Sequence, residues 1–435
     1  MCPVGYAIDG VDNFTRLEGA LAVATFSVDA STFAIVASPG SDGFQVMDVS
    51  DPSRPLPVGS ATDGAAGFTM LKRAQSVATF TIDDSTFAIV GSGAENGVQF
   101  VDVSDPWNRS PVPVSTATDG VGNFDTLAGV SGVAIFKIGD KAYAIVASRY
   151  DDGLQTIDVS DPYFPVALGT ATDGLEGFTT LNRPMDVATF VIGTSTFAIV
   201  TSSGDHGVQI VDINDPSNPL AVSSAIDGED GFSMLGRCQG VAIFTIDGGT
   251  FAIVTSIHGI QIIDLSNPRK PKAMGNAANG AEGFTELFGA TGVSIAVLGP
   301  ATYAVVTSFF GDVVQLVDVS DPSQPVAAGS ATQGEGGYDP LSGASGVATF
   351  DIDGTMYAIV ASHDDNGVML IHVRGAEGEA EGDYGNEPNV APPSGLEFSG
   401  QVLSSSPPSP PMSLEDISDK LDALIAQFTE MMSNP

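Results

Sequence analysis

Positive charge is scarce in this sequence. Only 15 of its 435 residues are Lys or Arg, whereas 53 are Asp or Glu, so the formal net charge is −38. Nucleic acids and anionic lipid surfaces are bound through clustered cationic side chains, and neither is therefore expected as a partner. The excess of acid instead favours solubility and association with cations.

Cysteine and long apolar runs are scarce as well. Cys2 and Cys238 are the only cysteines, which is too few for a disulfide framework or a Cys-x-x-Cys metal site. The uncharged stretch 287–310 is broken by Gly299-Pro300, so it predicts two buried strands and a turn rather than a membrane span. The first ten residues lack the charged and then apolar pattern of a secretion signal, so no such signal is expected.

Internal repetition is what the sequence has in abundance. A phrase of the type GVQIVDINDP recurs six times, and a degenerate copy, GVMLIHVRG, follows them. Aligned on the first acid of the phrase, the copies are 52 to 56 residues apart, a spacing typical of repeat architectures. The aligned residues are Asp48, Asp102, Asp158, Asp212, Asp264, Asp318 and His372.

Each unit contains four segments in which apolar residues alternate with polar ones, and this period predicts strands. In the second unit these segments are residues 77–82, 86–90, 98–103 and 112–117. Four strands repeated in seven units predict an all-β fold, a seven-bladed β-propeller of four-stranded antiparallel blades over residues 1–374. Residues 3–10 match the fourth strand of a unit and the seventh unit lacks one, so the N-terminal strand is predicted to close the ring.

The third-strand phrase, preceded by a strand of the form T-[FY]-A-[IV]-V, resembles the LVIVD-repeat propellers. The resemblance covers essentially all of residues 1–374. It implies a propeller and a surface-associated binding role, because such repeats occur mostly in large secreted or surface-attached proteins. It implies no catalytic residues, and a fold of this kind by itself does not define a function.

The composition changes after residue 374. Residues 375–412 are rich in Gly, Glu, Ser and Pro and predict an acidic linker. Residues 413–435 predict a short amphipathic helix that begins with a capping box. Its apolar residues follow a heptad spacing, which favours self-association, docking on a partner or docking on the propeller wall; the alternative is that so short a segment stays disordered. The heptad positions are Leu414, Ile417, Leu421, Leu424, Phe428 and Met431.

Acidic residues recur in the loops that lead into each unit and in the turns between second and third strands. An Asp-Gly pair in the lead-in loops is typical of turn geometry. The alternative is calcium, which takes about six to eight oxygen ligands and would have to be held between loops. The densest supplies of carboxylate are Asp227, Glu229 and Asp230 in one loop and Asp364 and Asp365 in another.

Three of the scarce cations share one position of the repeat. Arg73, Arg183 and Arg237 stand two residues after a repeated Leu, where other units have Gly. They are predicted either to pair with loop carboxylates or to bind an anionic group of a ligand. Asp186 is the one acid in a column of small residues on the innermost strand, and it is a candidate ligand-binding group at the mouth of the central channel.

These patterns favour a non-enzymatic module that presents an acidic face to a protein or carbohydrate ligand outside the cell or at a cell surface. No elbow, phosphate-loop or dinucleotide motif of an enzyme occurs. Two alternatives stay open. One is a metal-dependent hydrolase or lyase at the channel mouth, with zinc on His206 and His258. The other is an intracellular, cytoplasmic scaffold, which the missing secretion signal favours.

Overall fold

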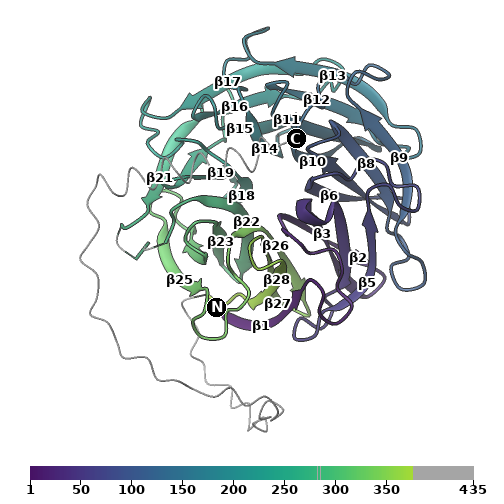
Figure 1. The fold of residues 1–435 in the computed structure, drawn as a ribbon. Coiled ribbons are helices and arrows are strands. Elements are labelled where there is room, and N and C mark those ends of the chain that lie inside the picture. The colour runs from purple at the N-terminus through teal and green to yellow at the C-terminus, as the bar shows by residue number, and fades with distance from the viewer. Residues whose placement is uncertain (282, 285, 376–435) are drawn as a thin grey trace, which may run out of the picture. The chain divides into compact units, whose positions relative to one another are not determined.

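The computed structural model describes residues 1–281, 283–284 and 286–375. Within these residues the chain forms 28 strands, which make seven four-stranded antiparallel sheets. Figure 1 shows the sheets as blades set around a central axis. The predicted seven-bladed β-propeller is thus confirmed, and the blades are numbered here from 1 to 7 in chain order.

Every blade has the same order of strands from the axis outwards. The innermost strands are β2 (Ala22–Val28), β6 (Ala74–Ile82), β10 (Val130–Ile138), β14 (Pro184–Ile192), β18 (Val241–Ile246), β22 (Ala290–Leu298) and β26 (Ala344–Ile352). The second strands are β3 (Ser31–Ser38), β7 (Ser85–Ser92), β11 (Lys141–Ser148), β15 (Ser195–Ser202), β19 (Gly249–Ser256), β23 (Ala301–Ser308) and β27 (Thr355–Ser362).

The outer two positions of each blade are equally regular. The third strands are β4 (Gly43–Asp48), β8 (Gly97–Asp102), β12 (Gly153–Asp158), β16 (Gly207–Asp212), β20 (Gly259–Asp264), β24 (Val313–Asp318) and β28 (Gly367–His372). The outermost strands are β5 (Leu56–Thr62), β9 (Val112–Thr118), β13 (Val166–Thr172), β17 (Leu220–Ile226), β21 (Lys272–Ala278), β25 (Val326–Thr332) and β1 (Cys2–Ile8). A short 3-10 helix, η1 (Pro39–Ser41), follows β3.

The N-terminal strand closes the ring as predicted. β1 is the outermost strand of blade 7 and pairs antiparallel with β28, from Cys2 opposite His372 to Ile8 opposite Gly367. The backbone groups of β28 that would otherwise form a free edge are therefore paired. The stretch 287–310 forms β22, β23 and their turn, as expected.

The hydrophobic core lies between neighbouring blades. At the first boundary, Phe33 and Phe44 of blade 1 pack with Leu71, Val90 and Val101 of blade 2 or its lead-in loop. Equivalent clusters fill the other boundaries. Because successive side chains of a strand point to opposite faces of the sheet, each central strand contributes to two of these clusters.

The buried glutamine of the repeated phrase fixes the lead-in loop of its own blade. Gln209 Nε2 donates hydrogen bonds to the backbone oxygens of Ile210 and Ser223, while its Oε1 accepts one from the backbone N of Thr179. A buried amide has to find such partners. The phrase thus specifies a loop position as well as a strand.

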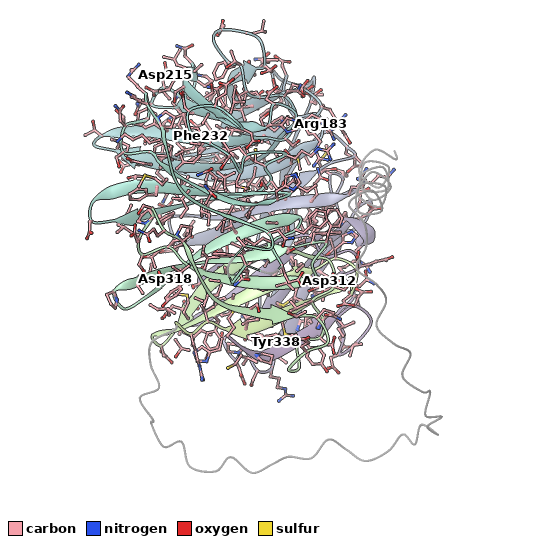
Figure 2. All side chains as sticks on the ribbon, turned by 90° about the vertical axis from the view of Figure 1, so that its left-hand side faces the viewer. Arg183, Asp215, Phe232, Asp312, Asp318 and Tyr338 are labelled. Atoms are coloured by element: carbon pink, nitrogen blue, oxygen red, sulfur yellow. The ribbon has the colours of Figure 1, made fainter. Side chains whose placement is uncertain are left out.

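The propeller presents two faces. One face, called the loop face here, carries the lead-in loops and the turns between second and third strands. The opposite face, called the Asp-Pro face, carries the turns of the Asp-Val-Ser-Asp-Pro type. In Figure 2, Arg183 and Asp312 mark the loop face, and Asp215 and Asp318 mark the Asp-Pro face. In the part of the chain that the structure describes, no helix is long and apolar enough to cross a bilayer.

The predicted C-terminal helix and all but the first residue of the predicted linker lie outside the described residues. The heptad positions and the oligomer that they predict therefore remain predictions.

Candidate functional site

The predicted arginine column lies on the loop face, where each lead-in loop meets its innermost strand. Arg73, Arg183 and Arg237 have φ angles of 53°, 54° and 52°, in the left-handed region where a Cβ costs about 1 kcal/mol relative to glycine. Backbone geometry alone therefore favours glycine at this position. The other four blades have it, at Gly19, Gly129, Gly289 and Gly343, all with positive φ.

The residue that lies over this position explains which blades accept a side chain. A Cβ at Gly129 would be 2.4 Å from the ring of Tyr150, which belongs to the turn after β11. At the corresponding turn position, blades 2 and 4 have the small residues Ala94 and Gly204. A Cβ at Gly289 would likewise be 2.3 Å from the ring of Phe310 in blade 6. In blades 2, 3, 4 and 6, arginine therefore occurs only where the turn leaves space, whereas blade 1 has glycine at both positions and blade 5 has Arg237 with His258.

Two of the three arginines have no acidic partner within the described chain. Arg183 and Arg237 are exposed, and among the residues that the structure describes neither forms an ion pair. The ion pairs of Arg109, Lys141 and Lys272 lie on the Asp-Pro face, as between Lys141 and Asp158. The interpretation that loop carboxylates hold these two guanidinium groups therefore has no contact to support it.

The loop carboxylates bond to backbone amides instead. Asp152, in the turn after β11, accepts a hydrogen bond at Oδ1 from the backbone N of Arg183 in the next blade, at 2.8 Å. We call this contact the inter-blade latch. It recurs between Asp42 and Arg73, Asn96 and Gly129, His206 and Arg237, Asp312 and Gly343, and Asn366 and Gly19.

Sequence reasoning did not identify the latch, although a signal was present. The residue before the one that opens each third strand is always Asp, Asn or His. These side chains accept hydrogen bonds and tolerate positive φ, which most of them have. The column therefore combines a local backbone requirement with a contact to the next blade.

The Asp-Gly column of the lead-in loops also has a structural role. Asp227 Oδ1 accepts a hydrogen bond from the backbone N of Leu235 at 2.8 Å. The equivalent bonds form at Asp9, Asp63, Asp119, Asp173 and Asn279. Turn capping accounts for the recurrence of this acid without a bound ion.

The candidate calcium ligands are spread over separate contacts. Asp365 Oδ2 accepts a hydrogen bond from the backbone N of Ser342 at 2.8 Å, and Asp364 Oδ1 lies 2.8 Å from His363 Nδ1. Across the described residues, no three His, Cys, Asp or Glu side chains are grouped so that they could hold a metal ion. The residues concerned are Asp227, Glu229, Asp230, Asp364 and Asp365.

The two histidines considered as zinc ligands also take part in separate contacts. His206 Nδ1 accepts the latch hydrogen bond of Arg237 at 3.0 Å, so this imidazole already has a backbone partner. His258 stands in a turn that is two residues shorter than the others, and its backbone oxygen accepts a hydrogen bond from Asn279.

Asp186 on β14 joins two blades. Its Oδ1 accepts a hydrogen bond from the backbone N of Val187 at 2.8 Å, and its Oδ2 accepts one from Val241 of blade 5 at 3.0 Å. The residue as a whole is partly exposed, but its carboxylate is enclosed, and this burial raises the pKa of Asp186 to about 6. The two backbone bonds oppose that rise because they favour the ionised form.

Arg149 is a buried cation that sequence reasoning missed. It follows β11 directly and is only 6% exposed. Within the described part of the chain, its Nε has no hydrogen-bond partner. The pKa of Arg149 is lowered to about 10, mainly by burial and also by the charges of Arg183 and Arg73, against the opposing effect of Tyr150. The only sequence signal was an arginine in a turn position that is otherwise uncharged or His.

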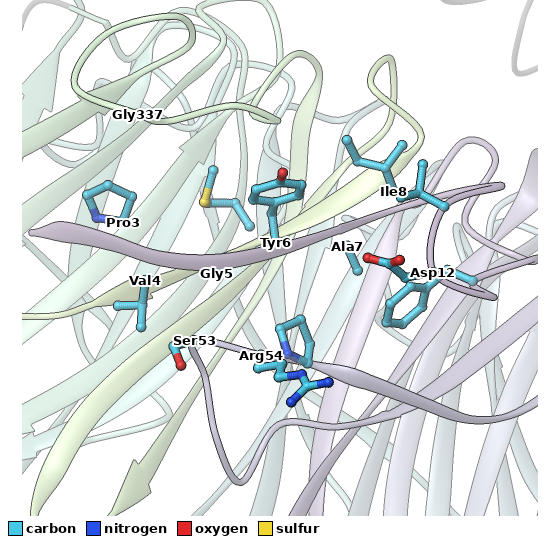
Figure 3. Close-up of a pocket in the computed structure, with 14 residues that line it drawn as sticks. Pro3, Val4, Gly5, Tyr6, Ala7, Ile8, Asp12, Ser53, Arg54 and Gly337 are labelled. Atoms are coloured by element: carbon cyan, nitrogen blue, oxygen red, sulfur yellow. The ribbon is translucent and has the colours of Figure 1, made fainter. Parts of the chain in front are cut away.

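Two surface features lie away from these residues. On the Asp-Pro face, the turns of blades 2 and 3 carry exposed aromatic side chains, Trp107, Tyr163 and Phe164. A groove of about 410 Å³ runs along β1. Figure 3 shows Tyr6 on one side of this strand and Arg54 on the other. Neither feature was identified from the sequence, because both combine segments that are distant in the chain.

Comparison with known proteins identifies the repeat. The family model described as "LVIVD repeat" matches residues 32–63, 201–226, 246–278 and 293–333, which lie in four of the seven units. No curated protein matches the chain at a significant level.

Solved structures share the fold at low sequence identity. A hydrazine synthase structure from Kuenenia stuttgartiensis has a TM-score of 0.58 at 14% identity, over 84% of this chain and 99% of that one. A functionally unknown protein from Desulfotomaculum acetoxidans DSM 771 has a TM-score of 0.56 at 14% identity, over 78% and 92%. BBS1N, solved in complex with ARL6DN, has a TM-score of 0.54 at 8% identity, over 86% and 99%. Identities this low establish a common architecture and nothing about activity.

Proposed function

Because the chain is a seven-bladed β-propeller with LVIVD repeats, we propose that it is a non-enzymatic interaction module that binds a protein or carbohydrate ligand on its loop face. Its place outside the cell or at a cell surface is part of the proposal and follows from the resemblance to other LVIVD-repeat propellers. The solved BBS1N propeller is in complex with another protein, which supports a binding role for this architecture.

The observation that carries the proposal is the arginine column. Arg183 and Arg237 stand in adjacent blades, adopt a backbone conformation that favours glycine, and have no ion pair among the described residues. Strained residues of this kind are common at functional sites. Arginine also offers a planar set of donors that matches carboxylate groups.

The surrounding charge favours selectivity for one kind of ligand. The loop face carries the latch and turn-capping carboxylates, so a large polyanion is repelled from it. A ligand with a mainly neutral or positive surface complements the acidic loops, and an acidic group on that ligand complements the arginines.

The proposal is tested with the double variant Arg183→Gly, Arg237→Gly. Glycine is the residue of four other blades and relieves the positive φ, so the free energy of unfolding is expected to stay the same or to rise by about 1 kcal/mol per site. Arrays of surface proteins and glycans are probed with the full chain and with the variant. Ligands of the full chain are expected to be lost by the double variant.

Arg54→Ser is the matched control, because it removes a cation from the Asp-Pro face. It is expected to keep every ligand. Retention of all ligands by the double variant contradicts the proposal. A lower melting temperature of that variant shows instead that the two arginines hold the loops.

A further inference from the structure

One pair of repeat positions brings an arginine to the loop face in each of three successive blades. The first residue after the second strand donates its backbone N–H to the oxygen of the residue in the arginine column. These bonds join Gly93 to Arg73 in blade 2 at 3.1 Å, Arg149 to Gly129 in blade 3 at 3.0 Å, and Ser203 to Arg183 in blade 4 at 3.1 Å. In blades 2 and 4 the arginine accepts this hydrogen bond, whereas in blade 3 the arginine donates it. Each of the three blades therefore has one arginine in the bonded pair.

Arg149 lies at the centre of this arc. It is only 6% exposed, and its Nε has no hydrogen-bond partner among the residues that the structure describes. The carboxylates of the neighbouring turns are directed elsewhere: Asp151 Oδ2 accepts a hydrogen bond from the backbone N of Ala128, and Asp205 Oδ2 accepts one from Asn182. A buried charge without a counter-charge is strongly unfavourable.

The neighbouring arginines increase that cost. Arg183 and Arg73 both act on the charge of Arg149, and like charges in a poorly hydrated region repel each other. The backbone N of Arg183 is held by Asp152 of the Arg149 turn, so the distance between the two blades is fixed. The equivalents of Arg149 in the flanking blades are the small residues Gly93 and Ser203.

We infer that Arg149, Arg73 and Arg183 form a binding site for a single oxyanion group, a carboxylate or a phosphate. That this oxyanion belongs to the ligand of the loop face rests on the proposed function. That the site binds an oxyanion rests on the three arginines alone. A guanidinium group binds either oxyanion through parallel hydrogen bonds, and the bound anion supplies the negative counter-charge that the buried Arg149 lacks. Acidic loops around the site favour a slender anion over a polyanion.

The test is calorimetric titration of the full chain at low ionic strength with inorganic phosphate and, separately, with sodium acetate. Saturable binding of at least one of them is expected, and the two titrations distinguish phosphate from carboxylate as the preferred group. Arg149→Ser, which installs the residue of blade 4, is expected to weaken that binding about tenfold or more. Arg149→Met keeps the side-chain volume if the serine variant does not fold, and the same loss is expected.

Arg54→Ser, on the opposite face, removes the same charge and is expected to bind phosphate and acetate as the unaltered chain does. The melting temperature of the unliganded Arg149→Met variant is expected to exceed that of the unaltered chain, because a buried charge is removed. The inference is overturned if neither anion binds saturably, or if the Arg149 variants bind like the unaltered chain. Binding of phosphate or acetate does not require the macromolecular ligand. The titrations therefore test the oxyanion site even when the arrays yield no ligand.

Discussion

Single side chains on the loop face are selected by the backbone amides that they can reach. Asp152 bonds across a blade boundary and Asp173 caps its own lead-in loop. Asp186 bonds across a boundary with one oxygen and to the next backbone N of its own strand with the other. Loop amides that lack a strand partner need an acceptor, and a short carboxylate supplies one at a fixed distance. Part of the negative charge of the loop face is therefore a consequence of how the loops are built.

Asp186 gives a prediction on pH. Its pKa is about 6 in the folded chain against an ordinary value of 3.8, so the folded state binds the proton more tightly than the unfolded state. The stability that this group contributes is fully present below about pH 4 and is lost as the pH rises through about 6, a change on the order of 2 to 3 kcal/mol. Chemical denaturation of the unaltered chain and of Asp186→Gly across this range measures it.

Glycine is the control residue because four other blades have it in this column. The difference in unfolding free energy between the two proteins is expected to be largest at the acidic end and to shrink as the pH increases. A difference that is constant with pH shows that Asp186 does not titrate in this window.

At the scale of the elements, the latch joins neighbouring blades on the loop face at six of the seven boundaries. Hydrophobic clusters hold the sheets together along their length, but they do not fix the relative height of neighbouring loops because burial is not directional. The latch hydrogen bond does so between the turn of one blade and the lead-in loop of the next.

The contribution of the latch is measured at Asp312, whose Oδ1 accepts hydrogen bonds from the backbone N of Gly343 at 2.7 Å and from the Ser342 hydroxyl at 3.3 Å. Asp312→Gly removes the acceptor and also relieves the positive φ of 53°, so any loss of stability comes from the bonds. We expect the free energy of unfolding to fall by about 1 kcal/mol in urea denaturation.

Asp312→Asn is the matched variant, because Asn96 and Asn366 make the latch in blades 2 and 7. It is expected to keep the stability of the unaltered chain. If the glycine variant is as stable as the asparagine variant, the latch bond has no net effect.

For the whole molecule, ring closure is the contact with the largest separation along the chain. β1 and β28 pair over seven residues of the N-terminal strand, and this pairing completes blade 7. Its loss leaves a row of unpaired N–H and C=O groups on β28.

Deletion of residues 1–8 is therefore expected to lower the melting temperature and to promote association, measured by calorimetry and light scattering. Tyr6→Ser is the control, since its side chain is 56% exposed and the backbone pairing stays intact. A deleted chain that melts like the full chain and stays monomeric contradicts this account of closure.

Self-association belongs to the same scale and stays a prediction from the heptad spacing of the C-terminal residues. A chain that ends at residue 374 is expected to sediment as a smaller species than the full chain, because the paired helices are lost. Leu421→Glu in the full chain is expected to have the same effect. Equal sedimentation of all three proteins removes the self-association hypothesis.

The strand pattern was predictable because it recurs in successive units of the sequence. In blade 2, the expected first strand began at residue 77, and β6 begins at Ala74. The pairing of β6 with β7 extends beyond the alternating residues, with a register irregularity between Ala74 and Ser76. Such an irregularity depends on the neighbouring strand and leaves no periodic signal.

The candidate site was predictable only in part. Arg73, Arg183 and Arg237 were recognisable because they share one column of the repeat. Arg149 was not, because it stands in another column, and only the hydrogen bond between its backbone N and Gly129 shows that the two columns are neighbours.

The sequence by itself determined the number of blades, the strands within each blade and the closure by the N-terminal strand. Repetition and alternation are local properties of the chain, and they suffice for these features. Only the tertiary structure decided which carboxylates are occupied by backbone amides and which arginine is buried without a partner. Those properties depend on contacts across blade boundaries, where residues about 20 to 55 positions apart meet at distances that no spacing in the sequence defines.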